Sequence, residues 1–377
     1  MNTTGGSDVY SDIDYETYSD FTTSVYIWNI FPPILIFFGT IGNVLSIIVL
    51  RRPKIRKSVC SIYFIALAVS DLLVLYTGLL RQWIHKTFDV DVRHMGSAGC
   101  KIHTWLVYFF LDFSSWILVA VTVERVFLVW FPRKATVKCT KNLTKLSLFV
   151  IGTCLLLVNS HILYGRGLDV TNSNGSSVVD YTCSYISDNY EDFWTSTWPS
   201  LDLAIFCGFP FCFLLIGNIL IFSKVLLSKR AVKRQCKNVV KTRKKDSKFS
   251  SMSLMLLVVN TTFLLCNTPI SVYLIGYETW VQKVHGRQYV ILEYLVWSVV
   301  NILMYLNNSI NFLLYILSGS RFRNEIKSML IKRRHITVAV VPQKYTRDHL
   351  SSTNCNTLNN RNPPTIFIKH SDRDSRC

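Results

Sequence analysis

Seven long apolar segments, separated by short polar stretches, constrain this chain more than any other feature of its sequence. A hydrocarbon core about 30 Å thick is crossed by roughly 20 apolar residues in a helix, and each segment is close to that length or longer. Lipid cannot satisfy free backbone groups, so such segments cross a membrane as helices. The sequence therefore predicts an all-α membrane protein, a seven-transmembrane helix bundle. The expected spans are residues 27–50, 58–84, 101–130, 146–164, 197–227, 250–276 and 288–317.

Charge and hydrophobicity are segregated along the chain. Half of the residues are hydrophobic, yet the formal net charge is +18. The basic residues lie mainly in short stretches between apolar segments and in the tail, and not on an amphipathic face with interleaved aromatic residues. This distribution excludes nucleic acid as the partner that the charge would otherwise suggest.

The orientation in the membrane follows from where Lys and Arg collect. They cluster after the first, third and fifth spans, and the positive-inside rule makes these loops cytosolic. Residues 1–50 contain no Lys, Arg or His. We expect a multi-pass plasma-membrane protein with its N-terminus outside and its C-terminus in the cytosol. Residues 1–24 lack a signal-peptide pattern, so the first span is expected to act as its own insertion signal.

The chain is expected to have four parts, with the bundle over residues 27–317. Residues 1–26 form an extracellular tail, and residues 318–332 alternate basic and apolar residues at helical spacing, as an amphipathic helix on the membrane surface would. A solvated charged stub is the alternative for this segment. Residues 333–377 have little apolar content and are predicted to be a disordered, phosphorylatable cytoplasmic tail.

Two of the eleven cysteines differ from the rest. Most others lie inside apolar stretches as small hydrophobic residues, and no CxxC motif or Cys/His cluster indicates a metal site. Cys100 and Cys183 fall in segments placed outside the cell, where oxidation is possible. A bridge between them would tie the loop after the fourth span to the start of the third. Two sequons on outside segments, at Asn2 and Asn174, predict glycosylation.

A set of polar residues lies at one depth inside the bundle. Asp71 stands midway through the second span, and charged residues within spans are functional candidates by default. Its carboxylate, surrounded by amide and hydroxyl oxygens, would suit Na⁺ as an allosteric ion. A purely structural hydrogen-bond cluster is the alternative. The residues expected around it are Asn43, Ser114, Asn307 and Asn311.

Glu124 and Arg125 end the third span on its cytosolic side. A carboxylate can hold an adjacent guanidinium inside the bundle, and releasing it would expose a cation to a cytosolic partner. A snorkelling pair at the membrane boundary is the alternative. Cys100 lies 25 residues before Arg125, about 37 Å of helix, so the two mark opposite ends of one span.

Taken in order, these features resemble the rhodopsin-like family of G-protein-coupled receptors over about residues 25–330. The resemblance implies a non-enzymatic receptor that activates heterotrimeric G proteins, with arrestin and receptor kinases acting on the tail. It rests on Gly42-Asn43, Leu67-Ala68-Val69-Ser70-Asp71, Cys100, Glu124-Arg125-Val126, Cys183, Pro210, Phe263, Cys266, Pro269, Asn311 and Tyr315. The residues it assigns to coupling and activation are Glu124, Arg125, Pro210, Phe263, Asn267, Pro269 and Tyr315.

The chain departs from the family pattern at residues that change conformation during activation in the family. Asn267 stands where the family usually has tryptophan, and the stretch from Asn311 to Tyr315 lacks the usual proline. Asn218 replaces a tyrosine that commonly supports the active state. A modified activation switch is therefore expected, with Arg125 held by Glu124 alone.

The resemblance also narrows the ligand. Val107 occupies the position of the aspartate in amine receptors, which argues against biogenic amines, and helix seven has no lysine for retinal. The outside is acidic and aromatic, which favours a basic or amidated neuropeptide, as in invertebrate receptors of the FMRFamide and thyrotropin-releasing-hormone-like groups. Ordinary solvated charge, or a receptor for a non-peptide small molecule, are the alternatives.

Two charges in the bundle are candidates for the ligand pocket. Arg81 lies ten residues, about 15 Å, outward from Asp71 and could bind a ligand carboxylate or carbonyl, or else snorkel. For Asp112, structural pairing with His161 or Arg166 is favoured over ligand contact. Further pocket candidates by depth are Gln82, His103, Thr104, Val107, Tyr108, Tyr273, Tyr277 and Trp297.

Other functional classes fit the sequence less well. A transporter predicts an internal repeat or broken helices in matching halves, and a membrane enzyme needs acid/base or nucleophilic groups converging at one depth; neither pattern is present. A non-signalling scavenger with receptor architecture stays open because of the altered switches.

Overall fold

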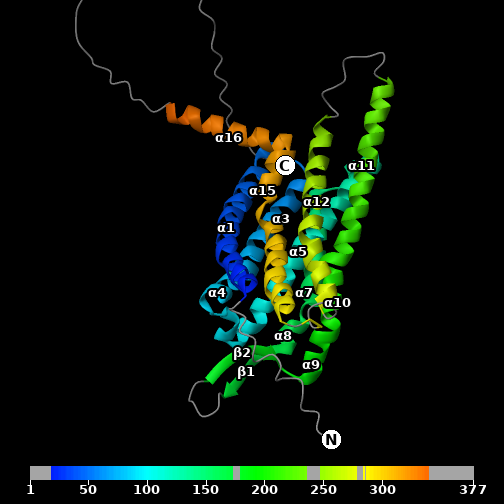
Figure 1. The fold of residues 1–377 in the computed structure, drawn as a ribbon. Coiled ribbons are helices and arrows are strands. Elements are labelled where there is room, and N and C mark those ends of the chain that lie inside the picture. The colour runs from blue at the N-terminus through cyan, green and yellow to red at the C-terminus, as the bar shows by residue number, and fades with distance from the viewer. Residues whose placement is uncertain (1–17, 173–178, 236–246, 278–282, 285, 339–377) are drawn as a thin grey trace, which may run out of the picture. The chain divides into compact units, whose positions relative to one another are not determined.

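The computed structural model describes residues 18–172, 179–235, 247–277, 283–284 and 286–338. Within them, seven helices are long and apolar enough to cross a membrane, which confirms the predicted fold (Figure 1). The first span begins at Ser19, eight residues before the predicted start at residue 27. The spans are Ser19–Leu50, Cys60–Phe88, Ser97–Trp130, Lys141–Gly165, Asp188–Lys224, Ser253–Gly276 and Arg287–Ser309.

Several spans are composites of shorter helical elements. Span one is α1 (Ser19–Leu50) and span three is α5 (Ser97–Trp130). Span two consists of α3 (Cys60–Val74), η2 (Leu75–Leu79) and α4 (Leu80–Phe88), and span four of α7 (Lys141–Val158) and α8 (His161–Gly165). Span five consists of α9 (Asp188–Asp192), η4 (Phe193–Thr197), α10 (Trp198–Leu203), η5 (Ala204–Gly208) and α11 (Phe209–Gln235). Span six lies in α12 (Ser247–Gly276), and helix seven comprises α13 (Arg287–Val290), η7 (Ile291–Val296), α14 (Trp297–Ser309) and α15 (Asn311–Ser318).

Short elements connect the spans. They are α2 (Pro53–Arg56), η3 (Val92–Met95) and α6 (Pro132–Lys138). After helix seven, α16 (Ser320–Val338) occupies the place of the expected amphipathic helix and runs beyond residue 332. The chain divides after Ile331 into two compact units, of which the first contains the bundle. Residues 1–17 and 339–377 lie outside the described residues, so the predicted N-terminal and C-terminal tails stay predictions.

Many large apolar side chains face outward while many small and polar ones are buried, as expected when lipid is the solvent. In α1, Phe37 and Phe38 are exposed, whereas Gly39 and Asn43 are buried. A Cβ added at Gly39 would lie 2.6 Å from Cδ1 of Leu75, so this glycine lets α1 approach η2 closely. Buried apolar residues form two clusters, one toward each end of the bundle.

Two antiparallel strands, β1 (Arg166–Asn172) and β2 (Val179–Tyr185), lie between spans four and five. Arg166 pairs with Tyr185 and Leu168 with Cys183. These strands were not predicted from the sequence. They lie at the end of the bundle opposite α15 (Figure 1).

Helix seven is interrupted at Ile310 although it lacks the proline that usually bends it there. α14 ends at Ser309 and α15 begins at Asn311, with Ile310 at φ −98° and ψ 0°. The carbonyl of Asn308 accepts a 2.9 Å hydrogen bond from Nδ2 of Asn43 in α1. A side chain that takes a backbone carbonyl out of the helical ladder is a recognised cause of a bend.

Candidate functional site

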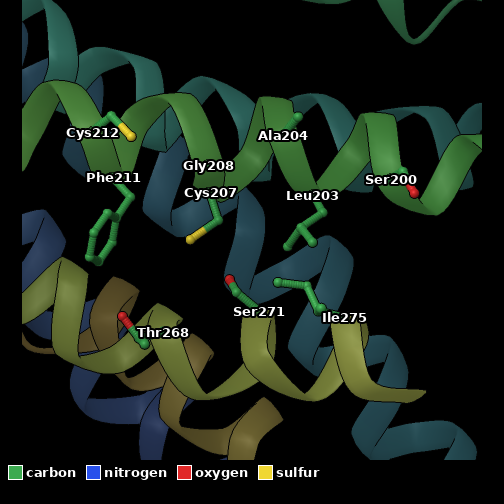
Figure 2. A pocket seen from close by; sticks show the side chains of 10 residues that line it. All are labelled: Ser200, Leu203, Ala204, Cys207, Gly208, Phe211, Cys212, Thr268, Ser271 and Ile275. Atoms are coloured by element: carbon green, nitrogen blue, oxygen red, sulfur yellow. The ribbon is translucent and has the colours of Figure 1, made fainter. Parts of the chain in front are cut away.

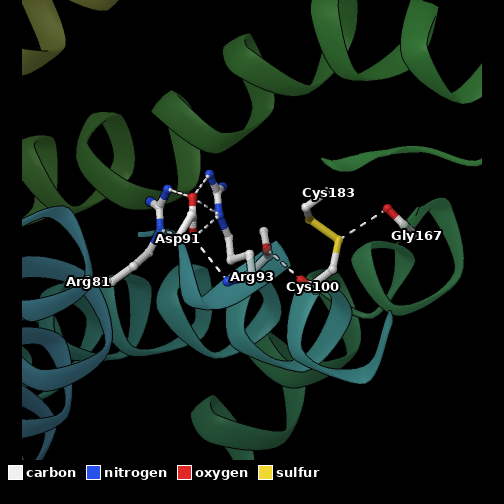
Figure 3. Close-up of a disulfide and its surroundings, with 7 residues drawn as sticks. Arg81, Asp91, Arg93, Cys100, Gly167 and Cys183 are labelled. Atoms are coloured by element: carbon white, nitrogen blue, oxygen red, sulfur yellow. Dashed lines mark hydrogen bonds and ion pairs between the residues drawn. A yellow bond between two sulfur atoms is a disulfide. The ribbon is translucent and has the colours of Figure 1, made fainter. Parts of the chain in front are cut away.

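A disulfide ties the hairpin to the start of span three. Cys100 and Cys183 are bonded with their Cα atoms 5.5 Å apart, which confirms the predicted pair (Figure 3). Sγ of Cys100 also lies 3.3 Å from the carbonyl oxygen of Gly167 in β1. The bridge therefore fixes both strands over one end of α5, called the disulfide end below.

Beside the disulfide, two arginines converge on one aspartate (Figure 3). Arg81 donates from Nη2 to Oδ2 of Asp91 at 2.5 Å, and Arg93 donates to the same oxygen at 2.7 Å. Burial alone would raise the pKa of Asp91, but the hydrogen bonds from Arg81 and Arg93 outweigh it and hold that pKa far below its usual range. The guanidinium predicted to bind a ligand is thus already paired with an acid from the following loop.

Replacing Asp91 by asparagine should destabilise the protein by about 2–3 kcal/mol, because Arg81 loses its counter-charge while partly buried and Arg93 keeps contact with water. The lowered pKa also fixes the pH dependence. The carboxylate contributes stability above its unfolded pKa near about 4, and this contribution is lost as pH falls below that value. The difference in Tm between wild type and Asp91→Asn should be constant from about pH 5 to 8 and shrink below about pH 4. A difference that instead changes between pH 6 and 8 would contradict this account.

The predicted pocket residues separate into two groups at the disulfide end. Tyr273 lies beside Tyr277 and Trp297 with tilted rings, whose centroids are 5.8 and 5.3 Å away. Across the bundle, Tyr108 meets Trp194 and Trp198 edge to face. Thr104 is buried and donates to the Cys100 carbonyl, and Nδ1 of His103 is buried without a hydrogen-bond partner. Gln82 and Val107 are half-buried.

Asp112 is paired differently from the prediction. It is 1% exposed, and Nδ2 of Asn159 donates to its Oδ2 at 2.9 Å. In the described part of the chain, neither His161 nor Arg166 forms an ion pair with it. The predicted neutralisation by one of these two residues is therefore wrong.

Aromatic residues engage both of the predicted partners instead. Nδ1 of His161 lies 2.9 Å from the Tyr190 hydroxyl. The guanidinium of Arg166 lies 4.5 Å from the Tyr185 ring centroid and 4.2 Å from that of Trp194, where the faces of the rings attract a cation.

In the middle of the bundle, the structure brings Asp71 together with two of its four expected neighbours. Ser114 donates to Oδ1 of Asp71 at 3.2 Å, and Asn311 donates to Oδ2 at 2.7 Å. Asn43 and Asn307 make hydrogen bonds to Asn308. The amide oxygens of Asn43, Asn307 and Asn311 are buried without hydrogen-bond partners.

At the opposite end of α5, a thiol holds Arg125. Its Nε and Nη2 both donate to Sγ of Cys60 at the start of α3. No ion pair joins Arg125 to Glu124 among the described residues, and both carboxylate oxygens of Glu124 are buried without a hydrogen-bond partner. The prediction that Glu124 alone holds Arg125 is therefore wrong, because the guanidinium turns toward α3.

Cys60→Ala should raise ligand-independent activity, because Arg125 loses a contact worth about 1 kcal/mol, which corresponds to a roughly fivefold shift in a two-state equilibrium. Cys60→Asp should lower it, because an ionised partner binds the guanidinium more strongly. Basal nucleotide exchange on a G protein measures both. Cys154→Ala, at an exposed cysteine of α7, is the control. If Cys60→Ala and the control show the same basal exchange, the thiol does not restrain Arg125.

The other residues assigned to activation are buried or half-buried between helices. Pro269 lies inside α12, and Pro210 is buried at the start of α11. Asn267 donates to the carbonyl of Phe263 at 2.9 Å instead of filling the space of a tryptophan ring. Tyr315 is fully buried against Phe64 and Phe322.

An amide bridge that was not predicted from the sequence joins three spans near this end. Nδ2 of Asn260 donates to Thr122 at 2.8 Å and to Oδ1 of Asn218 at 2.9 Å. Asn218 thus stands in place of the usual tyrosine and links α11 to α12. The signal available in the sequence was the similar depth of three polar residues in separate spans.

A crevice of about 360 Å³ lies between span five and α12 (Figure 2). Gly208, Cys212 and Ile275 line it and are exposed on the outside of the bundle. It contains none of the predicted pocket residues, so it is a feature of the lipid-facing surface. It is lined by Ser200, Leu203, Ala204, Cys207, Gly208, Phe211, Cys212, Thr268, Ser271 and Ile275.

The bundle and its motifs match a known family. Residues 42–315 match the family model described as 7 transmembrane receptor (rhodopsin family), which covers more than half of the chain. The chain belongs to this family. The receptor is therefore a non-enzymatic, multi-pass membrane protein.

Individual relatives of the receptor align over different lengths. It is 24% identical to the FMRFamide receptor of Drosophila melanogaster over 78% of this chain and 52% of that protein. It is 30% identical to the thyrotropin-releasing hormone receptor of Mus musculus over 40% of this chain and 38% of that protein. It is 24% identical to neuromedin-U receptor 1 of Rattus norvegicus over 90% of this chain and 81% of that protein. The chain thus spans about half or less of the first two relatives.

One contact in the receptor joins α16 to the loop after span one. Glu325 is buried, and its carboxylate lies 3.3 Å from Nζ of Lys54 and 3.7 Å from Nε of Arg52. Phe322 packs beneath it against Tyr315 and Phe312. These contacts position the start of α16 beside the end of the bundle that carries Arg125.

Proposed function

We propose that this protein is a receptor for an extracellular peptide and activates heterotrimeric G proteins from the end that carries Arg125. The observation that carries the proposal is the burial of the Arg125 guanidinium and its contact with a thiol. Its guanidinium is buried at the end of α5 opposite the disulfide and is held by the thiol of Cys60. Such a contact is weak enough for a partner to replace, which is what a coupling switch needs.

The proposed orientation places the disulfide end outside the cell. A disulfide persists in an oxidising compartment. Basic residues of α2 and α6 lie beside the Arg125 end, where the positive-inside rule places the cytosol. Residues 236–246 of the basic loop after span five lie outside the described residues. The sequons at Asn2 and Asn174 also lie outside them, so glycosylation at Asn2 and Asn174 stays a prediction.

The proposed ligand is a basic or amidated peptide. The names of two relatives, the FMRFamide receptor and the thyrotropin-releasing hormone receptor, support this class. Val107 at the amine-binding position of α5 supports it as well, because it supplies no charge for an amine. We also propose that arrestin and receptor kinases act on the tail, and that lipids contact the exposed apolar faces of the spans.

The test is to express the full chain in cells and apply a panel of amidated peptides, with FMRFamide among them, while calcium and cyclic nucleotides are measured. A peptide response in cells expressing the protein, and not in untransfected cells, is expected. Peptide binding to the surface without any nucleotide exchange would instead identify a non-signalling scavenger.

We further propose Na⁺ as an allosteric ion at Asp71. The residues fit it, because the buried carboxylate of Asp71 contacts the Ser114 hydroxyl and Asn311, whose amide oxygen has no hydrogen-bond partner. Oxygen atoms alone are suitable ligands for a small hard cation. Asp71, Ser114 and Asn311 would hold the ion.

Exchanging NaCl for choline chloride at equal ionic strength should lower the Tm of purified wild-type receptor by a few degrees, about 1 kcal/mol of ligand linkage. Asp71→Asn should show no difference between the two salts, because the charge that holds the ion is gone. Equal salt effects in wild type and variant would exclude Asp71 as the sodium ligand.

A further inference from the structure

Two hydrogen-bonded side chains in the half of the bundle near the disulfide each keep one acceptor oxygen without a donor. Asp112 in α5 is 1% exposed, and its Oδ1 has no hydrogen-bond partner. Asn159, after α7, is fully buried, and its Oδ1 also lacks a partner although its Nδ2 binds Asp112. Leaving a buried acceptor unsatisfied costs about 1–3 kcal/mol. Both oxygens are thus available to accept hydrogen bonds from a ligand that carries N–H donors.

The register between α5 and span five places a second carboxylate at the same depth. Tyr108 meets Trp198 at 5.9 Å between ring centroids. Four residues later on each helix, about one turn, stand Asp112 and Asp202.

A second contact between α5 and span five lies about one turn beyond Asp112 and Asp202, on the side away from the disulfide. Nε1 of Trp116 donates to the carbonyl of Ile205 at 3.1 Å. Asp202 therefore lies between two points where span five touches α5. Its neighbour Leu203 points toward α12 across the crevice (Figure 2).

No cation of the described residues neutralises this pair. The ion pairs found there involve neither Asp112 nor Asp202. His161 and Arg166, the two basic residues that could have paired with Asp112, are engaged by aromatic rings. Two carboxylates at one depth in a low-dielectric bundle cannot both stay ionised without a counter-cation. The bundle thus carries an acidic site that its own side chains leave uncompensated.

We propose that Asp112, Asp202 and Asn159 form the binding site for a guanidinium group of the receptor's ligand. The inference rests on the proposed function and adds the chemistry that the ligand must carry. A guanidinium has five N–H donors in a planar fork, which match two carboxylates and an amide oxygen better than the three donors of an ammonium.

The residues above the site favour the same group. Tyr108 and Trp198 place aromatic rings one turn closer to the disulfide, and a guanidinium stacks on such rings. The one-letter code FMRF in the name of the Drosophila melanogaster relative contains one arginine between apolar residues. A peptide of that kind would place its single cation on the acids and its apolar side chains against the surrounding aromatic residues.

A binding test that does not depend on signalling uses Nα-acetyl-arginine amide as the probe. Its matched control is Nα-acetyl-citrulline amide, which has the same shape and no charge. Millimolar arginine probe should raise the Tm of the purified full-length receptor in nanodiscs by roughly 2–4 °C, and the citrulline probe should not. Asp112→Asn and Asp202→Asn should each abolish the shift, whereas Asp192→Asn, at an exposed acid on the same end, should retain it.

Both substitutions keep the size of the side chain and remove an uncompensated charge, so the ligand-free Tm should be equal to or higher than that of wild type. If Asp112→Asn does not yield folded protein, the Tm shifts of Asp202→Asn with the two probes test the proposal. Equal shifts with the two probes in wild type, or a retained arginine-specific shift in Asp202→Asn, would overturn the proposal.

Signalling separates this proposal from the proposed function. Where FMRFamide activates the receptor, its citrulline analogue should be at least tenfold less potent on wild type and equally potent to the parent peptide on Asp112→Asn. If no peptide triggers nucleotide exchange but the arginine probe still stabilises the wild type selectively, the proposed function is wrong and the guanidinium site stands.

Discussion

Arg125→Ala is expected to abolish nucleotide exchange on a heterotrimeric G protein while surface expression and ligand binding remain largely intact. Arg125 lies about 37 Å along α5 from Cys100, so its loss does not reach the disulfide end. In the structure its guanidinium is buried against Cys60, and releasing it is the step that we assign to coupling. A drop to the background of untransfected membranes, more than tenfold, is the expected magnitude.

Binding of a non-hydrolysable guanine nucleotide to membranes measures this exchange, with ligand binding measured on the same preparation. Lys134→Ala, at an exposed basic residue of α6, is the matched control because it removes a cation at the same end without a buried contact. Exchange that persists at the wild-type level in Arg125→Ala would reject the coupling role.

Cys100→Ser and Cys183→Ser are expected to lose ligand binding to the same extent, and the double variant should be no worse than either single variant. The bridge closes a segment of 83 residues and fixes the hairpin over α5. Its loss should cost about 2–5 kcal/mol, which is a large share of the stability of a typical domain. Without the bridge, β2 is no longer tied to the start of α5, where the predicted ligand pocket opens.

Radioligand or fluorescent-peptide saturation binding, normalised to surface expression, measures the effect. Cys212→Ser, at an exposed cysteine of α11 outside the bridge, is the control and should bind normally. If one of the two single variants binds normally while the other does not, their shared bridge does not support the binding site.

The sequence predicted those parts of the fold that depend on depth along the membrane normal. Hydropathy located seven spans, and the placement of Cys100 and Cys183 outside the membrane identified the bridge. Depth also grouped Asp71 with Ser114 and Asn311. These features could be predicted because the thickness of the lipid core assigns a height to every residue of a span.

Contacts that depend on rotation about a helix axis could not be predicted. Cys60 was interpreted as a small hydrophobic residue, and nothing in its position along the chain shows that it faces Arg125. Asp202 was missed for the same reason. Span five contains two π-helical stretches, η4 and η5, and each wide turn changes which side chains face the neighbouring helix.

Contacts that depend on the path of the loops could not be predicted either. Asp91 follows span two, and its pairing with Arg81 requires the chain to double back, which hydropathy does not encode. The two short strands between spans four and five escaped prediction because a seven-residue strand beside long apolar helices gives only a weak periodic signal.

The break of helix seven at Ile310 makes the shape of that helix dependent on its neighbour. A proline bends a helix even when the helix is isolated, because the missing N–H is covalent. Here the bend accompanies a hydrogen bond donated by Asn43 of α1, so we expect it to depend on the contact between the first and seventh helices. If α1 tilted away, the carbonyl of Asn308 could accept the helical hydrogen bond again, and the segment that carries Asn311 and Tyr315 would straighten. This movement would shift Asn311, which donates to Asp71.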